Sequence, residues 1–156
     1  MASTVTTATM TVTVSESITL NGKNQGSINT LSIPAIANIS KRIVNVPASE
    51  VEIVAMSSAV GSGTFITADT LYIRITNLDG DNHVTLTFKS AGNHEFAVKL
   101  DKGQSFIYNG DLAGGVVDTM DAAATAITPD TFADLVDITA KANTASVDLE
   151  IFVACT

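Results

Sequence analysis

The stretch from Leu71 to Tyr108 constrains the fold most strongly, because four segments within it alternate apolar and polar side chains. The segments cover residues 71–76, 84–89, 95–100 and 105–108. This period-two alternation is typical of β-strands with one buried face. Turn residues separate the segments, namely Asp79-Gly80, Gly92-Asn93 and Asp101-Lys102-Gly103. We therefore predict two linked β-hairpins in a four-stranded meander whose apolar face packs against a second sheet.

The composition favours an all-β fold. Val, Ile and Thr, which are abundant here, prefer strands, whereas the helix formers Glu, Lys, Arg and Gln are scarce. A chain of 156 residues is long enough for one domain with a substantial core. We predict a single domain over residues 1–156, an antiparallel β-sandwich of jelly-roll-like type.

One short helix is predicted inside a long acidic loop, residues 111–137. Thr128 would cap this helix, with Pro129 at its first position and Asp130 in its first turn. Three apolar residues then follow at helical spacing: Phe132, Leu135 and Val136. Because long loops in compact domains usually carry function or form interfaces, we expect a role for this loop.

Residues 1–13 are predicted to be extended, either as an arm that pairs with a neighbouring subunit or as the first strand of the sandwich. A flexible tail remains an alternative for the first eight residues. Asn21-Gly22 is a strong signal for a two-residue turn. Pro34 predicts an edge strand or a bent one, because proline cannot donate a hydrogen bond to a central strand. The apolar alternation of residues 147–153 predicts a final strand held beside an early one.

The charge distribution argues against polyanionic partners. The net charge is −8, and residues 111–156 hold eight acidic side chains against Lys141 alone. The chain has no cluster of Lys or Arg, so we expect it to bind neither nucleic acid nor a membrane surface. The N-terminal residues lack the basic and apolar regions of a secretory signal, and no run is long enough to span a membrane. We expect synthesis in a cytoplasm, without export.

Three features suggest chemistry, and each has a simpler structural explanation. Residues 77–82 resemble a calcium loop, but Asn82 and Phe88 occupy the positions where an EF-hand needs glycine and glutamate. His83 and His94 would lie at opposite ends of one hairpin, about 20 Å apart, too far to share a metal ion. Cys155 cannot form a disulfide within the chain, and we expect it to end the last strand as a small apolar residue.

We accordingly expect no catalytic residue, no cofactor-binding residue and no metal ligand. Calcium binding by the acidic loop remains an alternative, although its carboxylates show no ligand periodicity. No glycine-rich phosphate loop is present, because residues 110–115 lack the lysine that follows in such motifs.

The central segment "LYIRITNLDGDNHVTLTFKSAGNHEFAVKLDKGQSFIYNGD" resembles small virion proteins of tailed phages, especially phages of marine and cyanobacterial hosts. The shared features are a strand ending "YIRITNLD", a following "VTL" strand and the "GQS" turn. The segments "SESITLNGKNQGSINTLSI" and "VDLEIFVA" are similar in style. The resemblance covers most of the chain and implies a β-sandwich or jelly-roll protein that assembles on a phage particle, with no enzymatic residues.

From the resemblance we expect a non-enzymatic structural protein of the virion, favouring a capsid decoration or cement protein. Its partners would be further copies of itself, as a homo-oligomer, and another virion protein, with the major capsid protein favoured. Two alternatives remain. One is a tail or head–tail adaptor component. The other is a carbohydrate- or surface-binding β-sandwich module, although Tyr72 and Tyr108 are its only tyrosines and tryptophan is absent.

Overall fold

The computed structural model describes residues 4–121 and 132–156. It contains thirteen strands and one short 3-10 helix. In order they are β1 (Ala8–Ser15), β2 (Thr19–Leu20), β3 (Lys23–Asn24), β4 (Ile28–Ile36), β5 (Asn38–Val46), β6 (Val51–Ser57), β7 (Phe65–Ile66), η1 (Thr67–Asp69), β8 (Thr70–Asn77), β9 (Val84–Ser90), β10 (Glu95–Leu100), β11 (Ser105–Asn109), β12 (Leu135–Ala142) and β13 (Val147–Cys155). The predicted all-β sandwich is confirmed.

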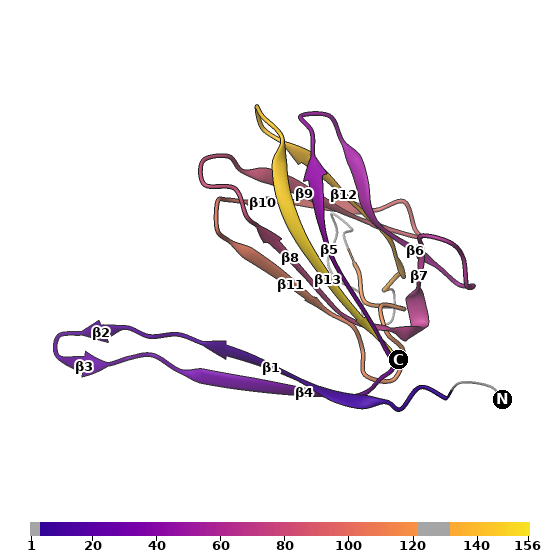
Figure 1. Ribbon diagram of the computed structural model, residues 1–156, viewed down its shortest axis with the longest axis horizontal. Coiled ribbons are helices and arrows are strands. Elements are labelled where there is room, and N and C mark those ends of the chain that lie inside the picture. The colour runs from indigo at the N-terminus through magenta and orange to yellow at the C-terminus, as the bar shows by residue number, and fades with distance from the viewer. Residues whose placement is uncertain (1–3, 122–131) are drawn as a thin grey trace.

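Two facing sheets form the sandwich (Figure 1). One sheet has the order β11-β8-β13-β5, and the other has the order β10-β9-β12-β6 with the short β7 added in parallel at its edge. The other pairings in both sheets are antiparallel. Setting β7 aside, the eight strands from β5 to β13 alternate between the sheets except at the β9–β10 hairpin, which is the wiring of a jelly roll.

The prediction of a four-stranded meander is wrong. β9 and β10 do form a hairpin, but β8 lies in the opposite sheet and pairs with β11. The apolar rows of β8 and β9 therefore face each other across the core instead of lying side by side. Alternation shows that a strand has one buried face. The same pattern arises when two strands are neighbours in one sheet and when they lie in facing sheets, so it could not separate these arrangements.

The core lies between the two sheets, and aromatic rings connect them. Phe88 of β9 is fully buried and stacks on Phe96 of the neighbouring β10, with ring centroids 4.9 Å apart. Across the sandwich it meets Phe106 at 4.9 Å and Tyr108 at 5.6 Å, both on β11. The Tyr108 hydroxyl lies 3.0 Å from that of Thr119, so the polar end of this ring also has a partner.

The helix predicted from Thr128, Pro129 and Asp130 begins outside the described residues. Its expected continuation is wrong, because Leu135 and Val136 lie in β12. Leu135, Ile138 and Ala140 of this strand are buried against the core. Two of the three apolar residues at helical spacing, Leu135 and Val136, are in fact the first residues of β12. A bulge after Leu135 makes this end of the strand irregular.

The first part of the acidic loop is anchored to the sandwich. Asp111 and Gly115 close a tight turn, and Val116 and Met120 beyond it are buried in the core. The carboxylate of Asp134 accepts the backbone N–H of Asp118 at 3.0 Å. Residues 111–120 therefore pack on the protein as a structural connection.

Candidate functional site

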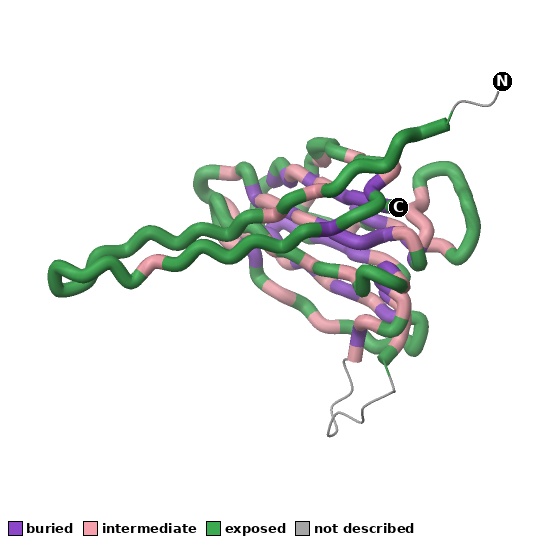
Figure 2. Tube along the Cα trace, turned by 90° about the horizontal axis from the view of Figure 1, so that it is seen from below, coloured by how far each residue is buried: buried purple, intermediate pink, exposed green. Residues whose placement is uncertain are grey.

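The N-terminal strands form a long two-stranded ribbon that projects beyond the sandwich (Figures 1 and 2). β1 pairs with β4 in antiparallel register from Met10 opposite Ile33 to Ser15 opposite Ile28. The same register continues through backbone bonds from Glu16 to Ser27 and from Gln25 to Ile18, and then through β2 and β3. Of the segment predicted to be extended, residues 8–13 lie in β1 and pair with β4 of the same chain. We call the whole ribbon, residues 8–36, the arm.

The tip of the arm is a two-residue turn, as its sequence predicts. Asn21 and Gly22 have φ values of 50° and 74°. Positive φ at both central residues defines the type I′ turn, whose twist matches that of paired strands, and Asn-Gly is its preferred sequence. Nearer the sandwich, Pro34 lies in β4, which pairs with β1 alone, so the predicted edge position is confirmed.

The root of the arm packs on the outer face of the β11-β8-β13-β5 sheet. Ile33 and Ile36 of β4 are buried there against Tyr72 of β8 and Ala154 of β13. The ring of Tyr72 meets that of Phe152 edge-on, with centroids 6.1 Å apart. This second, smaller core holds the arm at one end.

The apolar row of the arm becomes more exposed along its length. Met10 and Val12 are half-buried at the root, whereas Val14 is 43% exposed. Farther out in the same alternation, Ile18 is 54% exposed and Leu20 is 59% exposed. The arm thus carries an apolar row longer than its own sandwich can cover.

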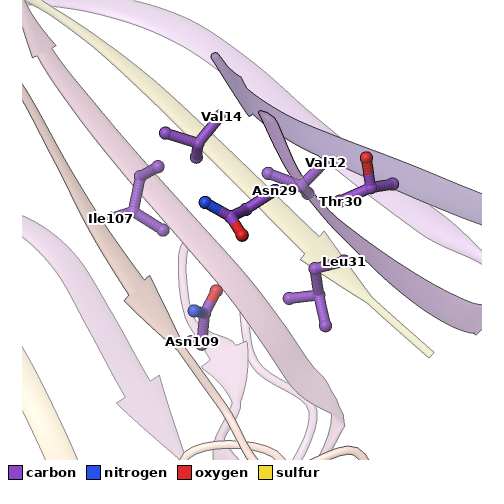
Figure 3. Close-up of a pocket in the computed structure, with 7 residues that line it drawn as sticks. All are labelled: Val12, Val14, Asn29, Thr30, Leu31, Ile107 and Asn109. Carbon is purple, nitrogen blue, oxygen red and sulfur yellow. The ribbon is translucent and has the colours of Figure 1, made fainter. Parts of the chain in front are cut away.

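A groove runs between the arm and the sandwich (Figure 3). It has a volume of about 360 Å³. Its lining consists of side chains from β1, β4 and β11: Val12, Val14, Asn29, Thr30, Leu31, Ile107 and Asn109. The lining is mainly aliphatic and amide, without a titratable side chain, so the groove suits packing and not proton transfer.

The opposite side of the same outer face carries an ion-pair cluster. The carboxylate of Glu150, on β13, forms ion pairs with the guanidinium of Arg74, on β8, at 2.5 Å and with the ammonium of Lys41, on β5, at 3.0 Å. The hydrogen bond from Arg74, followed by that from Lys41, lowers the pKa of the Glu150 carboxyl. Lys41 is flanked in its strand by Ile39 and Ile43, which are 54% and 63% exposed.

The Glu150 cluster predicts an acid-dependent contribution to stability. Because its pKa is lower in the folded chain, the contribution is present above the unfolded value near 4.5 and is lost as pH falls through the folded value. Glu150→Gln should therefore lower the melting temperature at pH 7 and leave it close to wild type in strong acid. Thermal unfolding across this pH range measures the difference, and equal curves at every pH would contradict the prediction.

The residues with candidate chemistry have structural roles. One carboxylate oxygen of Asp79 accepts the backbone N–H groups of Asp81 at 2.8 Å and Asn82 at 2.6 Å. These bonds, that from Asn82 first, lower the Asp79 pKa and close the loop that resembled a calcium site. Gly80 does not adopt positive φ, so hydrogen bonds to the Asp79 side chain, and not a left-handed glycine, close this turn.

The two histidines lie where the sequence predicts. His83 directly precedes β9, and its carbonyl accepts the N–H of Asn143. His94 directly precedes β10, at the other end of the hairpin. Across residues 4–121 and 132–156, no group of three or more His, Cys, Asp or Glu side chains is placed to hold a metal ion.

Cys155 is the last residue of β13 and is buried, as predicted. Its sulfur lies 3.6 Å from the hydroxyl of Thr70. Burial raises the pKa of this thiol, which makes it a poor nucleophile. Cys155 is therefore a packing residue.

The aromatic side chains serve the core. Of the six phenylalanines and two tyrosines, all but Phe132 are buried or half-buried. Sugar-binding sites usually need exposed rings for stacking.

Among the described residues, no helix is long and apolar enough to cross a membrane.

The fold and the arm together define the chain as a jelly-roll protein with a projecting β-ribbon. No protein-family model matches it, and no curated protein does. A search of solved structures found similarity to a chain described as "Bacillus endospore appendages form a novel family of disulfide-linked pili". The identity is 13%, the TM-score is 0.43, and the match covers 76% of this chain and 85% of that one. A likeness at this level says nothing about function.

Proposed function

We propose that this chain is a non-enzymatic structural protein of a phage virion, a capsid decoration or cement protein that self-assembles and binds the major capsid protein. The observation that carries the proposal is the arm, a ribbon with an exposed apolar row that projects from a well-packed sandwich. A ribbon exposed in this way is typical of proteins that complete their packing on a neighbour. The jelly roll is compatible, since it builds viral shells, but lectins share it, so the fold alone does not decide.

The electrostatics support a proteinaceous partner. The chain as a whole carries a net charge of −8, which opposes binding to nucleic acid or anionic lipid. The arm contains one acid and one base, Glu16 and Lys23, and is therefore neutral. A neutral, apolar arm can approach a protein surface without the repulsion that the sandwich would meet.

The resemblance to phage virion proteins in the central segment supports the placement on a particle. A tail or head–tail adaptor position is the alternative within this class. The carbohydrate-binding alternative is weakened by the burial of the tyrosines, since Tyr72 is buried and Tyr108 stacks on Phe88.

The proposal is tested on particles. Virions purified from a strain that carries this gene should contain the chain in mass spectrometry, and cryo-electron microscopy should show its density repeated over the capsid surface. Density at the tail or neck would move the protein to the adaptor alternative and overturn the decoration role. Absence from purified particles would overturn the proposal as a whole.

A further inference from the structure

Two side-chain rows on this chain match each other in spacing and oppose each other in charge. On the arm, Val14, Glu16 and Ile18 follow at intervals of two residues. On β5, Ile39, Lys41 and Ile43 follow at the same interval. Each row is apolar, charged, apolar, and the central charge is negative on the arm and positive on β5.

Both rows are exposed. Glu16 lies on the same face of the arm as Val14, which lines the groove, by strand alternation, and its carboxylate accepts the hydroxyl of Ser27 across the ribbon at 2.6 Å. Lys41 points away from the core, since its side chain meets Glu150 on the outer face of β13. The isoleucines beside Lys41 share that face by strand alternation.

The arm of a chain covers only part of its own outer face. Its groove lies over β11, where Ile107 and Asn109 line it. The sheet order β11-β8-β13-β5 puts β5 at the opposite edge. The row on β5 is thus left open by the chain's own arm.

We infer that the row Val14-Glu16-Ile18 of one copy docks on the row Ile39-Lys41-Ile43 of a second copy. Glu16 then joins Lys41, and the isoleucines leave water on both sides of this pair. The occupant is a second copy because the two complementary surfaces occur on the same chain. This inference rests on the proposed function, for which it names the contact between copies.

The size of the contact determines how the copies assemble. The overhang from Ser15 to Leu20 is about 20 Å long at about 3.3 Å per residue, and the ribbon is about 10 Å wide. One arm therefore buries about 200 Å² of its own surface, well below the roughly 800 Å² per partner of a stable pairwise interface. Each copy both gives an arm and receives one, so contacts can accumulate in a reciprocal dimer, a larger closed ring or a continuing array.

Sedimentation velocity of the full-length chain, from micromolar to millimolar concentration, tests the contact. We expect the wild-type chain to associate as its concentration rises. Ile18→Asp on the arm and Ile43→Asp on β5 should each raise the concentration for association by about tenfold or more, because each places a carboxylate in an apolar contact. The matched control is Val60→Asp, at an exposed loop residue outside both rows, which should associate like wild type.

A charge exchange makes the test specific. Glu16→Lys and Lys41→Glu should each weaken association, and an equimolar mixture of the two chains should restore it, since every arm again meets an opposite charge. A wild-type chain that stays monomeric at millimolar concentration overturns the inference, as does association that Ile43→Asp leaves unchanged. If the wild-type chain is monomeric in solution but is found on virions, the docking inference fails while the proposed function stands.

Discussion

Phe88→Ala should lower the free energy of unfolding by about 3–5 kcal/mol, the range for removing a fully buried aromatic ring. Phe88 is fully buried and contacts rings from both sheets, at centroid distances of 4.9 Å to Phe96 and Phe106 and 5.6 Å to Tyr108. Because these neighbours lie on strands of opposite sheets, they cannot close the cavity without moving the sheets together. Urea unfolding, followed by far-UV circular dichroism, measures the change.

The matched control is Phe132→Ala, which removes the same ring from a site that is largely exposed. Its effect should be within about 0.5 kcal/mol of wild type, the usual range for surface substitutions. A loss for Phe88→Ala no larger than that for Phe132→Ala would contradict the role of Phe88 as the link between the sheets.

Asn77→Ala should lower the free energy of unfolding by about 2–4 kcal/mol, because it leaves one buried and one partly buried carbonyl without a donor, at about 1–3 kcal/mol each. The Asn77 side chain is fully buried at the end of β8 and donates to the carbonyls of Asn82 at 2.9 Å and Leu100 at 3.2 Å. Its side-chain oxygen also accepts the N–H of Asp79 at 2.9 Å. The side-chain amide of Asn77 thus links the β8–β9 connection to the start of the β10–β11 connection, and both connections cross from one sheet to the other.

Asn45→Ala is the control for this substitution. Asn45 is exposed on β5, and its side chain donates to Asp148 at 2.7 Å. Removing an exposed pair of this kind should change stability by less than about 0.5 kcal/mol. If the two variants unfold at the same urea concentration, Asn77 does not hold the crossings.

The sequence predicts where the strands lie better than how they connect. The alternation at Leu71–Tyr108 predicted four strands within one or two residues of their positions, and the alternation at Val147–Val153 predicted the last strand and its early partner. The alternation could not assign the strands to sheets, because it shows that a strand has one buried face but not to which of the two facing sheets the strand belongs. The helix prediction failed at Leu135 because three apolar residues satisfied a helical spacing by coincidence.

The sequence of the arm contains a hairpin signal. Asn21-Gly22 predicted a turn, and apolar Val12 and Leu31 stand at equal distances on either side of it, as the two strands of one hairpin require. The sequence near Tyr72 does not predict its burial, because the root of the arm that covers it comes from a distant part of the chain. The exposure of Ile39, Lys41 and Ile43 follows from the position of β5 at the edge of the sheet order, which strand alternation does not reveal.

The position of β13 has a consequence for how the chain folds. β13 lies between β5 and β8 and pairs with both along nearly its whole length, although about 100 residues separate it from β5. The sheet therefore cannot close until almost all of the described chain has been synthesised, and distant pairings of this kind fold slowly. The arm, in contrast, closes on its own turn, and isolated hairpins form in microseconds. A nascent chain therefore forms its arm before the sheet that carries Ile39, Lys41 and Ile43 is complete.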